Sequence, residues 1–270
     1  MALIWQKQVT HAGKTTQYEV RNAGRTRRLY TNGVFHSQYS PSRPVAGSVW
    51  DLLLLPAFFH RPGLINRVLV LGVGGGAVLK QLQYFLQPEV IVGVELNPVH
   101  IQVAKRFFKV TGDEFELVCA DALEWLEQYQ GPPFDLIIDD LFGEEGGEPC
   151  RAVAADEAWC ALLKKHLMDS GSVAINFDTP ELMQRCFWLA EHAADPKALS
   201  KKSPATNDHL PADWWQQVYQ LSTPLYSNCI ALFTQQPTPR HEFLENLRQF
   251  KELDESRTTC KLNYQLRRVR

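Results

Sequence analysis

The run Val68-Leu69-Val70-Leu71-Gly72-Val73-Gly74-Gly75-Gly76 decides the fold of this 270-residue chain. Its four consecutive apolar residues predict a strand buried on both faces, as in a parallel sheet covered by helices. The glycines allow a sharp turn and a close approach of the backbone to a ligand, where a Cβ would collide. Val78, Leu82 and Leu86 then share one face of an amphipathic helix. The run therefore predicts a strand, a nucleotide-binding loop and a helix in succession.

Similar short apolar runs, separated by helical segments, follow along the chain at 90–94, 115–119, 136–138 and 173–175. Continuous apolar strands that alternate with helices are typical of a doubly wound, mostly parallel α/β sheet. Two later strands, at 218–222 and 229–233, are joined by too few residues for a crossover helix. We therefore predict a Rossmann-like α/β fold whose parallel sheet ends in an antiparallel hairpin.

The remaining segments divide the chain into three predicted regions. Residues 4–36 alternate apolar and polar side chains, and Asn22-Ala23-Gly24 and Asn32-Gly33 favour tight hairpin turns. We assign 1–48 to an N-terminal antiparallel β unit with its linker, 49–239 to the Rossmann-like catalytic domain, and 240–270 to a C-terminal helix and tail. Helices are expected at 49–59, from Pro98 to 107, and at 154–167, 181–192 and 240–253. Residues 196–213 are expected to form an inserted loop, and the basic tail a solvated terminus.

Composition narrows the class of protein. The formal net charge is −2 with dispersed basic residues, so neither a nucleic acid nor an anionic membrane is indicated as a partner. The N-terminus lacks the pattern of a secretion signal, and no apolar segment reaches the roughly 18 residues of a membrane span, so we expect a cytoplasmic protein. Six cysteines without a Cys-x-x-Cys pair indicate reduced thiols and no metal site.

Two acids follow the strands next to the glycine loop. Glu95 ends the second strand, where a carboxylate can accept hydrogen bonds from both ribose hydroxyls of a nucleoside cofactor. Asp121 follows the third strand and is placed to accept from an adenine amino group, with Leu96 and Ala122 as apolar contacts around the ring. The predicted cofactor-binding residues are Gly72, Gly74, Gly75, Gly76, Glu95, Leu96, Asp121 and Ala122.

Two different interpretations of these residues remain open. Gly72, Gly74 and Ala77 satisfy G-x-G-x-x-A, so an NAD-dependent oxidoreductase is one of them. The glycine run, the acid after the third strand and the final hairpin are not required by a dinucleotide fold. Glu95 alone also suits a structural role at the start of the helix that Asn97 caps, where the helix dipole favours an acid.

Several motifs together resemble a known family. They are Thr31-Asn32-Gly33-Val34, Leu55-Pro56, the glycine run itself, Gly93-Val94-Glu95-Leu96-Asn97, Cys119-Ala120-Asp121-Ala122-Leu123-Glu124-Trp125 and Phe134-Asp135-Leu136-Ile137-Ile138-Asp139-Asp140. Over roughly residues 15–235 the chain resembles spermidine synthase and the spermidine synthase-like methyltransferases. The resemblance implies a class I methyltransferase fold, S-adenosyl-L-methionine (AdoMet) or its decarboxylated form as cofactor, and a homodimer assembled through the N-terminal β unit.

The chain departs from spermidine synthase at the residues that the family uses on polyamines. The family's glycine loop contains an aspartate that holds the aminopropyl end of decarboxylated AdoMet, and Gly75 stands in its place. Of the two acids in the family's Asp-Ser-Ser-Asp segment only the first is kept, as Asp140. A Tyr-Gln pair expected before Leu55-Pro56 is replaced by approximately Ser48-Val49. A site without these groups should bind polyamines poorly, because their ammonium groups would lie unpaired.

The segment from Asp140 to Pro149 instead resembles the pattern Asp-x-Phe-Gly-(acidic)-x-x-Pro of bacterial spermidine synthase-like methyltransferases. The leading hypothesis is methyl transfer from AdoMet to a small acceptor, with Asp140 as catalytic base or substrate anchor. Competing hypotheses are a polyamine aminopropyltransferase, an AdoMet-binding protein without catalysis, and an Asp140 that only caps a turn.

Two further groups are candidates for contact with the acceptor. Glu144, Glu145 and Glu148 are either a mobile acidic lid that selects a cationic acceptor or a solvated loop. The aromatic residues His36, Tyr39, Trp214 and Trp215 either line an acceptor pocket or belong to the core.

Overall fold

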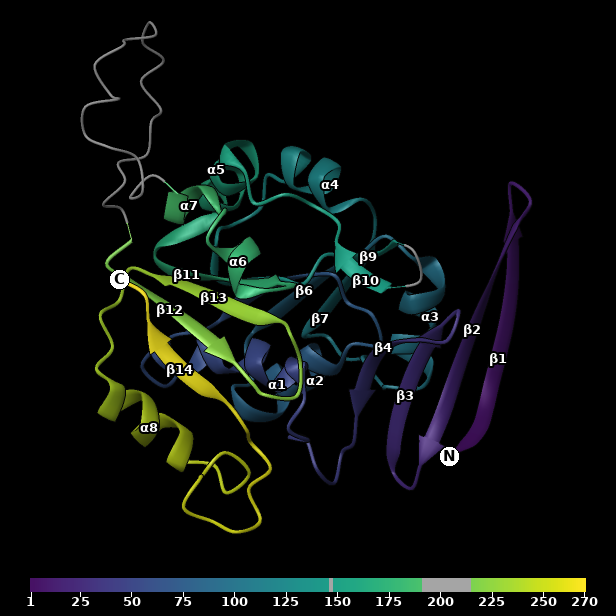
Figure 1. Cartoon of the computed structure of the whole chain (residues 1–270), viewed down its shortest axis with the longest axis horizontal. Coiled ribbons are helices and arrows are strands. Elements are labelled where there is room, and N and C mark those ends of the chain that lie inside the picture. The colour runs from purple at the N-terminus through teal and green to yellow at the C-terminus, as the bar shows by residue number, and fades with distance from the viewer. Residues whose placement is uncertain (146–147, 191–214) are drawn as a thin grey trace, which may run out of the picture.

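The computed structural model describes residues 1–145, 148–190 and 215–270, and its centre is an eight-stranded sheet (Figure 1). The strand order is β14-β12-β13-β11-β8-β5-β6-β7. The parallel strands are β5 (Arg67–Leu71), β6 (Val90–Glu95), β7 (Phe115–Cys119), β8 (Phe134–Asp139) and β11 (Leu167–Phe177). β13 (Cys229–Thr234) runs antiparallel to both β11 and β12 (Gln217–Ser222). The predicted parallel sheet with a closing antiparallel hairpin is confirmed.

The strand order reverses at the centre of this sheet. β6 lies on one side of β5 and β8 on the other, with Leu71 paired opposite Asp139 at their carboxyl ends. Val68, Leu69 and Val70 are fully buried, as expected of a strand covered on both faces. Ligands of open α/β sheets bind beyond the carboxyl ends of the strands at such a reversal. The topology therefore places a site after Leu71 and Asp139.

Helices cover both faces of the sheet (Figure 1). One layer contains α1 (Val49–Leu54), the 3-10 helix η1 (Leu55–Phe59), α2 (Ala77–Phe85), α3 (Pro98–Arg106) and α8 (Arg240–Arg248). The other contains α4 (Ala122–Gln128), α5 (Glu157–Lys165), α6 (Pro180–Met183) and α7 (Phe187–Ala190). Asn97 caps α3 as predicted, because its Oδ1 accepts a 2.9 Å hydrogen bond from Val99 N. In the described part of the chain no helix is both long and apolar enough to cross a membrane.

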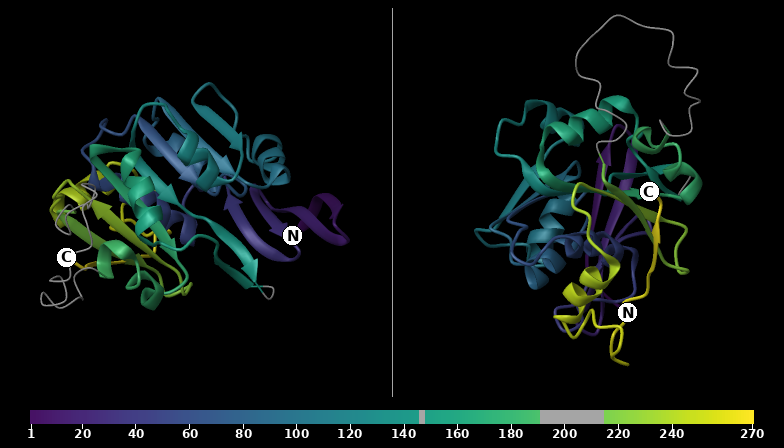
Figure 2. Two further views of the ribbon diagram at one scale, coloured as in Figure 1. Left: turned by 90° about the horizontal axis from the view of Figure 1, so that it is seen from above. Right: turned by 90° about the vertical axis from the view of Figure 1, so that its left-hand side faces the viewer.

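A second sheet stands at the end of the molecule opposite to the C-terminal strand (Figure 2). It is an antiparallel meander of β1 (Ala2–His11), β2 (Lys14–Ala23), β3 (Thr26–Thr31) and β4 (Val34–Tyr39). Both predicted turns are present, with positive φ at Gly24, Asn32 and Gly33. The sheet packs on α3, where the rings of Trp5 and Phe107 lie 5.6 Å apart. The domain limits at residues 48 and 239 remain predictions.

Several predicted elements differ in extent. The helix expected at 49–59 tightens to a 3-10 helix at Leu55, because Pro56 has no N–H to donate. The helix expected at 181–192 is replaced by the two short helices α6 and α7, and α8 ends at Arg248 rather than at 253. The basic tail is not a free end, since β14 (Gln265–Arg268) pairs with β12 and covers its exposed edge. The loop expected at 196–213 lies outside the described residues.

Candidate functional site

A cavity of about 380 Å³ lies at the carboxyl ends of the central strands, where the sheet order reverses. Six of the eight predicted cofactor-binding residues line it together with the predicted catalytic acid: Gly72, Gly74, Glu95, Leu96, Asp121, Ala122 and Asp140. Gly75 and Gly76 belong to the same turn but are not part of the lining. Of the predicted acceptor-pocket residues, His36 lines the cavity, Tyr39 faces a different one, and Trp215 is buried in the core. Trp214 lies outside the described residues.

The first glycine of the loop is required by a close backbone crossing. Gly72 has φ +87°, and a Cβ there would collide with the carbonyl group of Asp140, at 2.8 Å from its carbon. Asp140 N also donates a 2.8 Å hydrogen bond to Leu71 O. The two chain segments that follow β5 and β8 therefore touch through their backbones. This contact holds the glycine loop against the predicted catalytic residue.

Gly75 is crowded for a different reason. A Cβ at this position would lie 2.7 Å from Cζ of Phe108 and 2.8 Å from Cβ of Ser37. Both neighbours are buried, so neither can move aside without disturbing its surroundings. The space that an aspartate side chain would need is occupied by a phenyl ring from the end of α3 and by β4.

Glu95 shapes the loop as well as the cavity. Its Oε2 accepts hydrogen bonds from the backbone N–H groups of Val73 (3.0 Å) and Gly74 (2.8 Å), and its Oε1 accepts from Asn97 N at 2.9 Å. Burial opposes its ionisation, but His100 and the backbone donors outweigh burial and lower the pKa of Glu95. The residue is thus an ionised acceptor at the position expected to meet ribose hydroxyls, and it also orders the glycine loop.

The predicted adenine-contacting residues surround one end of the cavity. Asp121 caps α4, with Oδ1 accepting from Leu123 N at 2.9 Å and from Glu124 N at 3.2 Å. The side chains of Leu96 and Leu123 are 68% and 43% exposed although they are apolar. Exposed leucines beside a cavity offer a flat apolar surface to a ring. Leu123 was not among the predicted residues.

Asp140 points into the cavity and is held by an amide chain. Asn176 Nδ2 donates to Asp140 Oδ1 at 2.7 Å, and Asn228 Nδ2 donates to Asn176 Oδ1 at 3.2 Å. Burial raises the pKa of Asp140 to about 7; the nearby charge of Asp139 adds to this effect, and the Asn176 hydrogen bond opposes it. A carboxyl group with such a pKa can exchange a proton near neutral pH, as a catalytic base must.

The neighbouring Asp139 points the other way, because successive residues at a strand end face opposite sides. Its carboxylate is completely buried and pairs with Arg151, at 2.5 Å from Nη2 and 3.1 Å from Nη1. Trp159 Nε1 donates a third bond at 2.8 Å. Asp139 also accepts from Leu141 N at 3.3 Å, so this residue, and not Asp140, caps the turn after β8.

Several further lining residues are not predicted from the sequence, among them Asn176, Asp178, Tyr226 and Asn228. Asn176 and Asp178 lie at the carboxyl end of β11, next to the apolar run 173–175. Polar residues directly after a parallel strand are the signal that points to them. Tyr226 and Asn228 come from the connection between β12 and β13, where the sequence carries no comparable signal.

Another part of the wall of this cavity comes from the N-terminal sheet. Burial, with a smaller effect of the neighbouring His100, lowers the pKa of His36 to about 4, so its imidazole is neutral at physiological pH. No described residue forms a hydrogen bond with its buried Nε2 atom. His100 in turn forms a 2.9 Å hydrogen bond with Thr31 Oγ1. This wall carries a neutral ring beside the glycine loop.

The acidic segment after β8 forms a hairpin of β9 (Phe142–Glu145) and β10 (Glu148–Arg151). Phe142 and Pro149 from this hairpin line the cavity, which makes it one rim of the site. The lid predicted for Glu144, Glu145 and Glu148 therefore has a paired backbone instead of an irregular loop. Within the described ranges there is no cluster of His, Cys, Asp and Glu suited to a metal ion.

The raised pKa of Asp140 predicts a pH-dependent effect of Asp140→Asn on stability. A raised carboxyl pKa stabilises the fold below the ordinary value near 4, and this contribution is lost as the pH rises through about 7. The variant lacks the group that titrates, so its free energy of unfolding relative to the parent should increase by about 2–3 kcal/mol from pH 5 to pH 8. Urea unfolding at both pH values measures this; an equal difference at the two would contradict it.

Comparison with known proteins finds related sequences and structures. The family model described as spermine/spermidine synthase domain matches residues 52–195. Polyamine aminopropyltransferase 2 of Ralstonia nicotianae is 29% identical over 172 residues, which cover 61% of this chain and 32% of that protein. Such curated relatives are thus matched over about a third of their length.

Two solved structures are similar to most of this chain. A probable spermidine synthase from Corynebacterium glutamicum has a TM-score of 0.64 at 14% identity, covering 97% of this chain and 90% of that one. Human methyltransferase-like protein 13 in complex with SAH has a TM-score of 0.53 at 20% identity, covering 76% and 89%. At these identities the structures support the fold, and they confirm its class.

Proposed function

The chain belongs to the spermine/spermidine synthase family, and from that premise we propose that it transfers a methyl group from AdoMet to a small amine. The crowding around Gly75 carries this proposal. The aspartate that would mark an aminopropyl donor site is absent, and Phe108 and Ser37 occupy the space where its side chain would stand. Aminopropyl transfer therefore lacks the carboxylate that would position its donor.

The cavity fits the nucleoside part of AdoMet. Gly72 and Gly74 line the cavity, Glu95 is an ionised acceptor for ribose hydroxyls, and Leu96 offers an exposed apolar side chain for the adenine. When bound, AdoMet supplies an electrophilic methyl group on its sulfonium. The residues around it then have to orient the acceptor, accept a proton and exclude water.

Asp140 is the residue for proton removal. An amine that arrives as an ammonium must first give one proton to a base, which frees the lone pair of its nitrogen. The nitrogen then forms the new bond to the methyl carbon, while the carbon–sulfur bond breaks and its electrons remain on sulfur. The proton can go to the carboxylate of Asp140, which Asn176 holds in place at 2.7 Å. Asp178 adds a second carboxylate on the same rim. This acidic lining favours an amine that reaches the cavity as a cation.

A second candidate is polyamine aminopropyl transfer, which the names of the curated relatives favour. It would use decarboxylated AdoMet and the same base. We rank an AdoMet-binding protein without catalysis and an NAD-dependent oxidoreductase below these two functions. Assembly as a homodimer and a cytoplasmic location remain predictions.

Calorimetry with three cofactors tests the proposal. AdoMet is expected to bind at least about tenfold more tightly than decarboxylated AdoMet or NAD, because one lost charge-assisted contact corresponds to about that factor. Tighter binding of decarboxylated AdoMet would overturn methyl transfer in favour of the second candidate, and preferential binding of NAD would overturn both.

The same experiment on Gly75→Asp and on Gly75→Asp/Phe108→Ala examines the crowding itself. The single variant should gain no affinity for decarboxylated AdoMet, because the new side chain meets Phe108 and Ser37. Removing the ring makes room for the carboxylate, so the double variant should bind decarboxylated AdoMet about tenfold more tightly than the single one. Phe108→Ala alone is the control for the cavity that the missing ring leaves.

A further inference from the structure

A second and larger cavity, of about 730 Å³, lies between the N-terminal sheet and the ends of α2 and α3. We call it the basic cavity, because its lining contains four cationic side chains, Arg25, Arg27, Lys80 and Lys109, and a single carboxylate, Glu114. Its lining shares no residue with the cavity that contains Asp140. Its volume is in the range of small-molecule sites, which is roughly 300–1,000 Å³.

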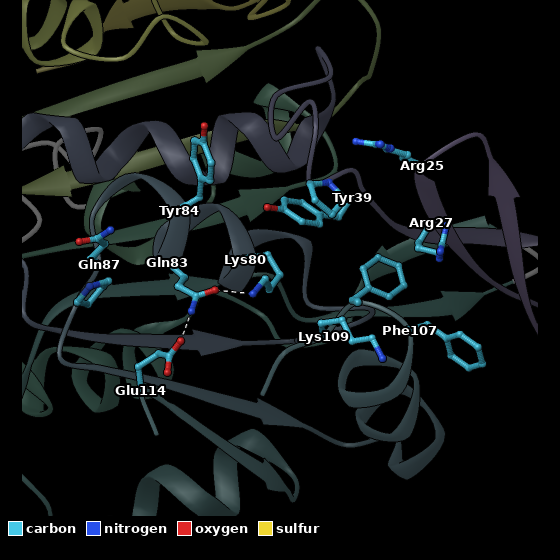
Figure 3. A pocket seen from close by; sticks show the side chains of 13 residues that line it. Arg25, Arg27, Tyr39, Lys80, Gln83, Tyr84, Gln87, Phe107, Lys109 and Glu114 are labelled. Atoms are coloured by element: carbon cyan, nitrogen blue, oxygen red, sulfur yellow. Dashed lines mark hydrogen bonds between the residues drawn. The ribbon is translucent and has the colours of Figure 1, made fainter. Parts of the chain in front are cut away.

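The charges in this cavity are unevenly paired (Figure 3). On one wall Lys80 donates to Gln83, and Gln83 donates to Glu114. On the other wall, none of Arg25, Arg27 and Lys109 forms an ion pair with another residue of the described chain. Three cations from two segments, the start of β3 and the loop after α3, thus share one wall without a counter-charge among the described residues.

Arg27 and Lys109 each carry an energetic cost. Nη1 of Arg27 is sealed from solvent and has no hydrogen-bond partner in the described structure, so part of the guanidinium has lost its hydration without compensation. Lys109 has φ +60°, in the left-handed region that residues other than glycine seldom adopt. Strained or unpaired groups of this kind are often retained at binding sites.

Aromatic rings complete the lining. Of the four rings in the lining, Tyr84 is exposed, Phe107 is half-buried, and Tyr39 and Phe108 are buried. Figure 3 shows Tyr39 between Tyr84 on one side and Arg25 on the other. Glu114 provides an acceptor for a hydroxyl or amino group. The combination of cations for an anion, rings for a flat group and one acceptor matches an aromatic organic phosphate.

We propose that the basic cavity binds a small organic phosphate with an aromatic ring, of the size and chemistry of a nucleoside 5′-monophosphate. The phosphate lies against Arg27 and Lys109, with Arg25 at the rim, and the ring lies on the aromatic side chains. A guanidinium has five N–H donors, so Arg27 can bind a phosphate through donors other than Nη1. The site is independent of the transfer reaction proposed for Asp140.

Calorimetry on the full chain tests this with four probes: AMP, adenosine, ribose 5-phosphate and inorganic phosphate. AMP should bind most tightly, and each of the other three at least about tenfold more weakly, because each lacks at least one part of the ligand. Affinity for AMP should fall as ionic strength rises. Equal binding of adenosine and AMP, or no binding of AMP at millimolar concentration, would overturn the proposal.

Variants locate the binding. Arg27→Gln/Lys109→Gln should weaken AMP binding by about 100-fold, about tenfold for each cation removed. Lys105→Gln/Arg248→Gln removes the same net charge at exposed positions outside the cavity and should change it less than about twofold. Glu95→Gln, in the other cavity, should leave AMP binding unchanged. Loss of binding in Glu95→Gln, with none in the arginine–lysine variant, would assign AMP to the cofactor cavity and refute the basic site.

Discussion

Replacing Asp140 by asparagine is expected to lower kcat for methyl transfer by about 100- to 10,000-fold, the usual contribution of a general base. The amide has nearly the shape of the carboxyl group, and its Oδ1 can still accept the hydrogen bond from Asn176 Nδ2. What it cannot do is take up a proton. The dissociation constant for AdoMet should therefore change by less than about twofold, since the loss falls on the chemical step. Single-turnover rates and calorimetry measure the two quantities.

The pH profile of kcat/KM shows whether Asp140 acts as a base or only as a negative charge. In the parent, kcat/KM should rise through a pKa near 7 as Asp140 ionises, and this limb should be absent from the variant. Asp178→Asn is the matched control, because it neutralises another carboxylate on the cavity wall without removing the proposed base. It should affect KM for a cationic acceptor more than kcat. Equal losses of kcat in both variants would indicate a general electrostatic effect and refute the role of Asp140 as base.

The fold was largely predictable because its signals are local. A continuous apolar run such as Val68 to Leu71 is typical of a parallel strand that is buried on both faces. The glycines after it accept backbone angles that other residues avoid. Asn97 and Pro98 likewise specify the start of a helix through their own backbone chemistry. Such features depend on a few neighbouring residues, so a sequence pattern describes them well.

The site was less predictable because it depends on contacts between distant segments. Phe108 fills the space at Gly75 from the far end of α3, and nothing near residue 75 indicates this. Asn176 holds the side chain of Asp140 from 36 residues further along the chain. Asn228 in turn holds Asn176 from another 52 residues further along. The sequence also does not show which of two adjacent aspartates faces the cavity, since this follows from the pleat of β8 and the position of Arg151. Tertiary packing decides all three.

Replacing Arg151 by alanine should destabilise the fold by about 3–5 kcal/mol, because it leaves the buried carboxylate of Asp139 without its cation. The side chains of Arg151 and Asp139 are only 8% and 0% exposed. Arg151 also donates to Asn176 O at 3.1 Å, so the change removes a link between the β9–β10 hairpin and the strand that carries Asn176. Among the described residues, Trp159 alone then remains as a side-chain donor to Asp139. Urea unfolding followed by circular dichroism measures the loss.

The chain contains a matched control for this prediction. Arg21 pairs with Glu19 at 2.5 Å and lies 5.4 Å from the centre of the Tyr30 ring, much as Arg151 pairs with Asp139 and lies 5.3 Å from that of Phe177. The Arg21 side chain is 41% exposed, however, so Arg21→Ala should cost less than about 1 kcal/mol. Similar losses in the two variants would show that burial does not set the value of the Asp139–Arg151 pair.

A double variant shows whether the unpaired charge causes the loss. Asp139→Asn/Arg151→Ala removes both charges, so it should be more stable than Arg151→Ala by about 1–3 kcal/mol, the cost of leaving a buried polar group unsatisfied.

Arg151 also influences the proposed catalytic base. Burial is the main cause of the raised pKa of Asp140, and the positive charge of Arg151 partly offsets it. In Arg151→Ala the lower limb of the kcat/KM profile should therefore move to higher pH, which links the buried ion pair on one side of β8 to the proposed base on the other.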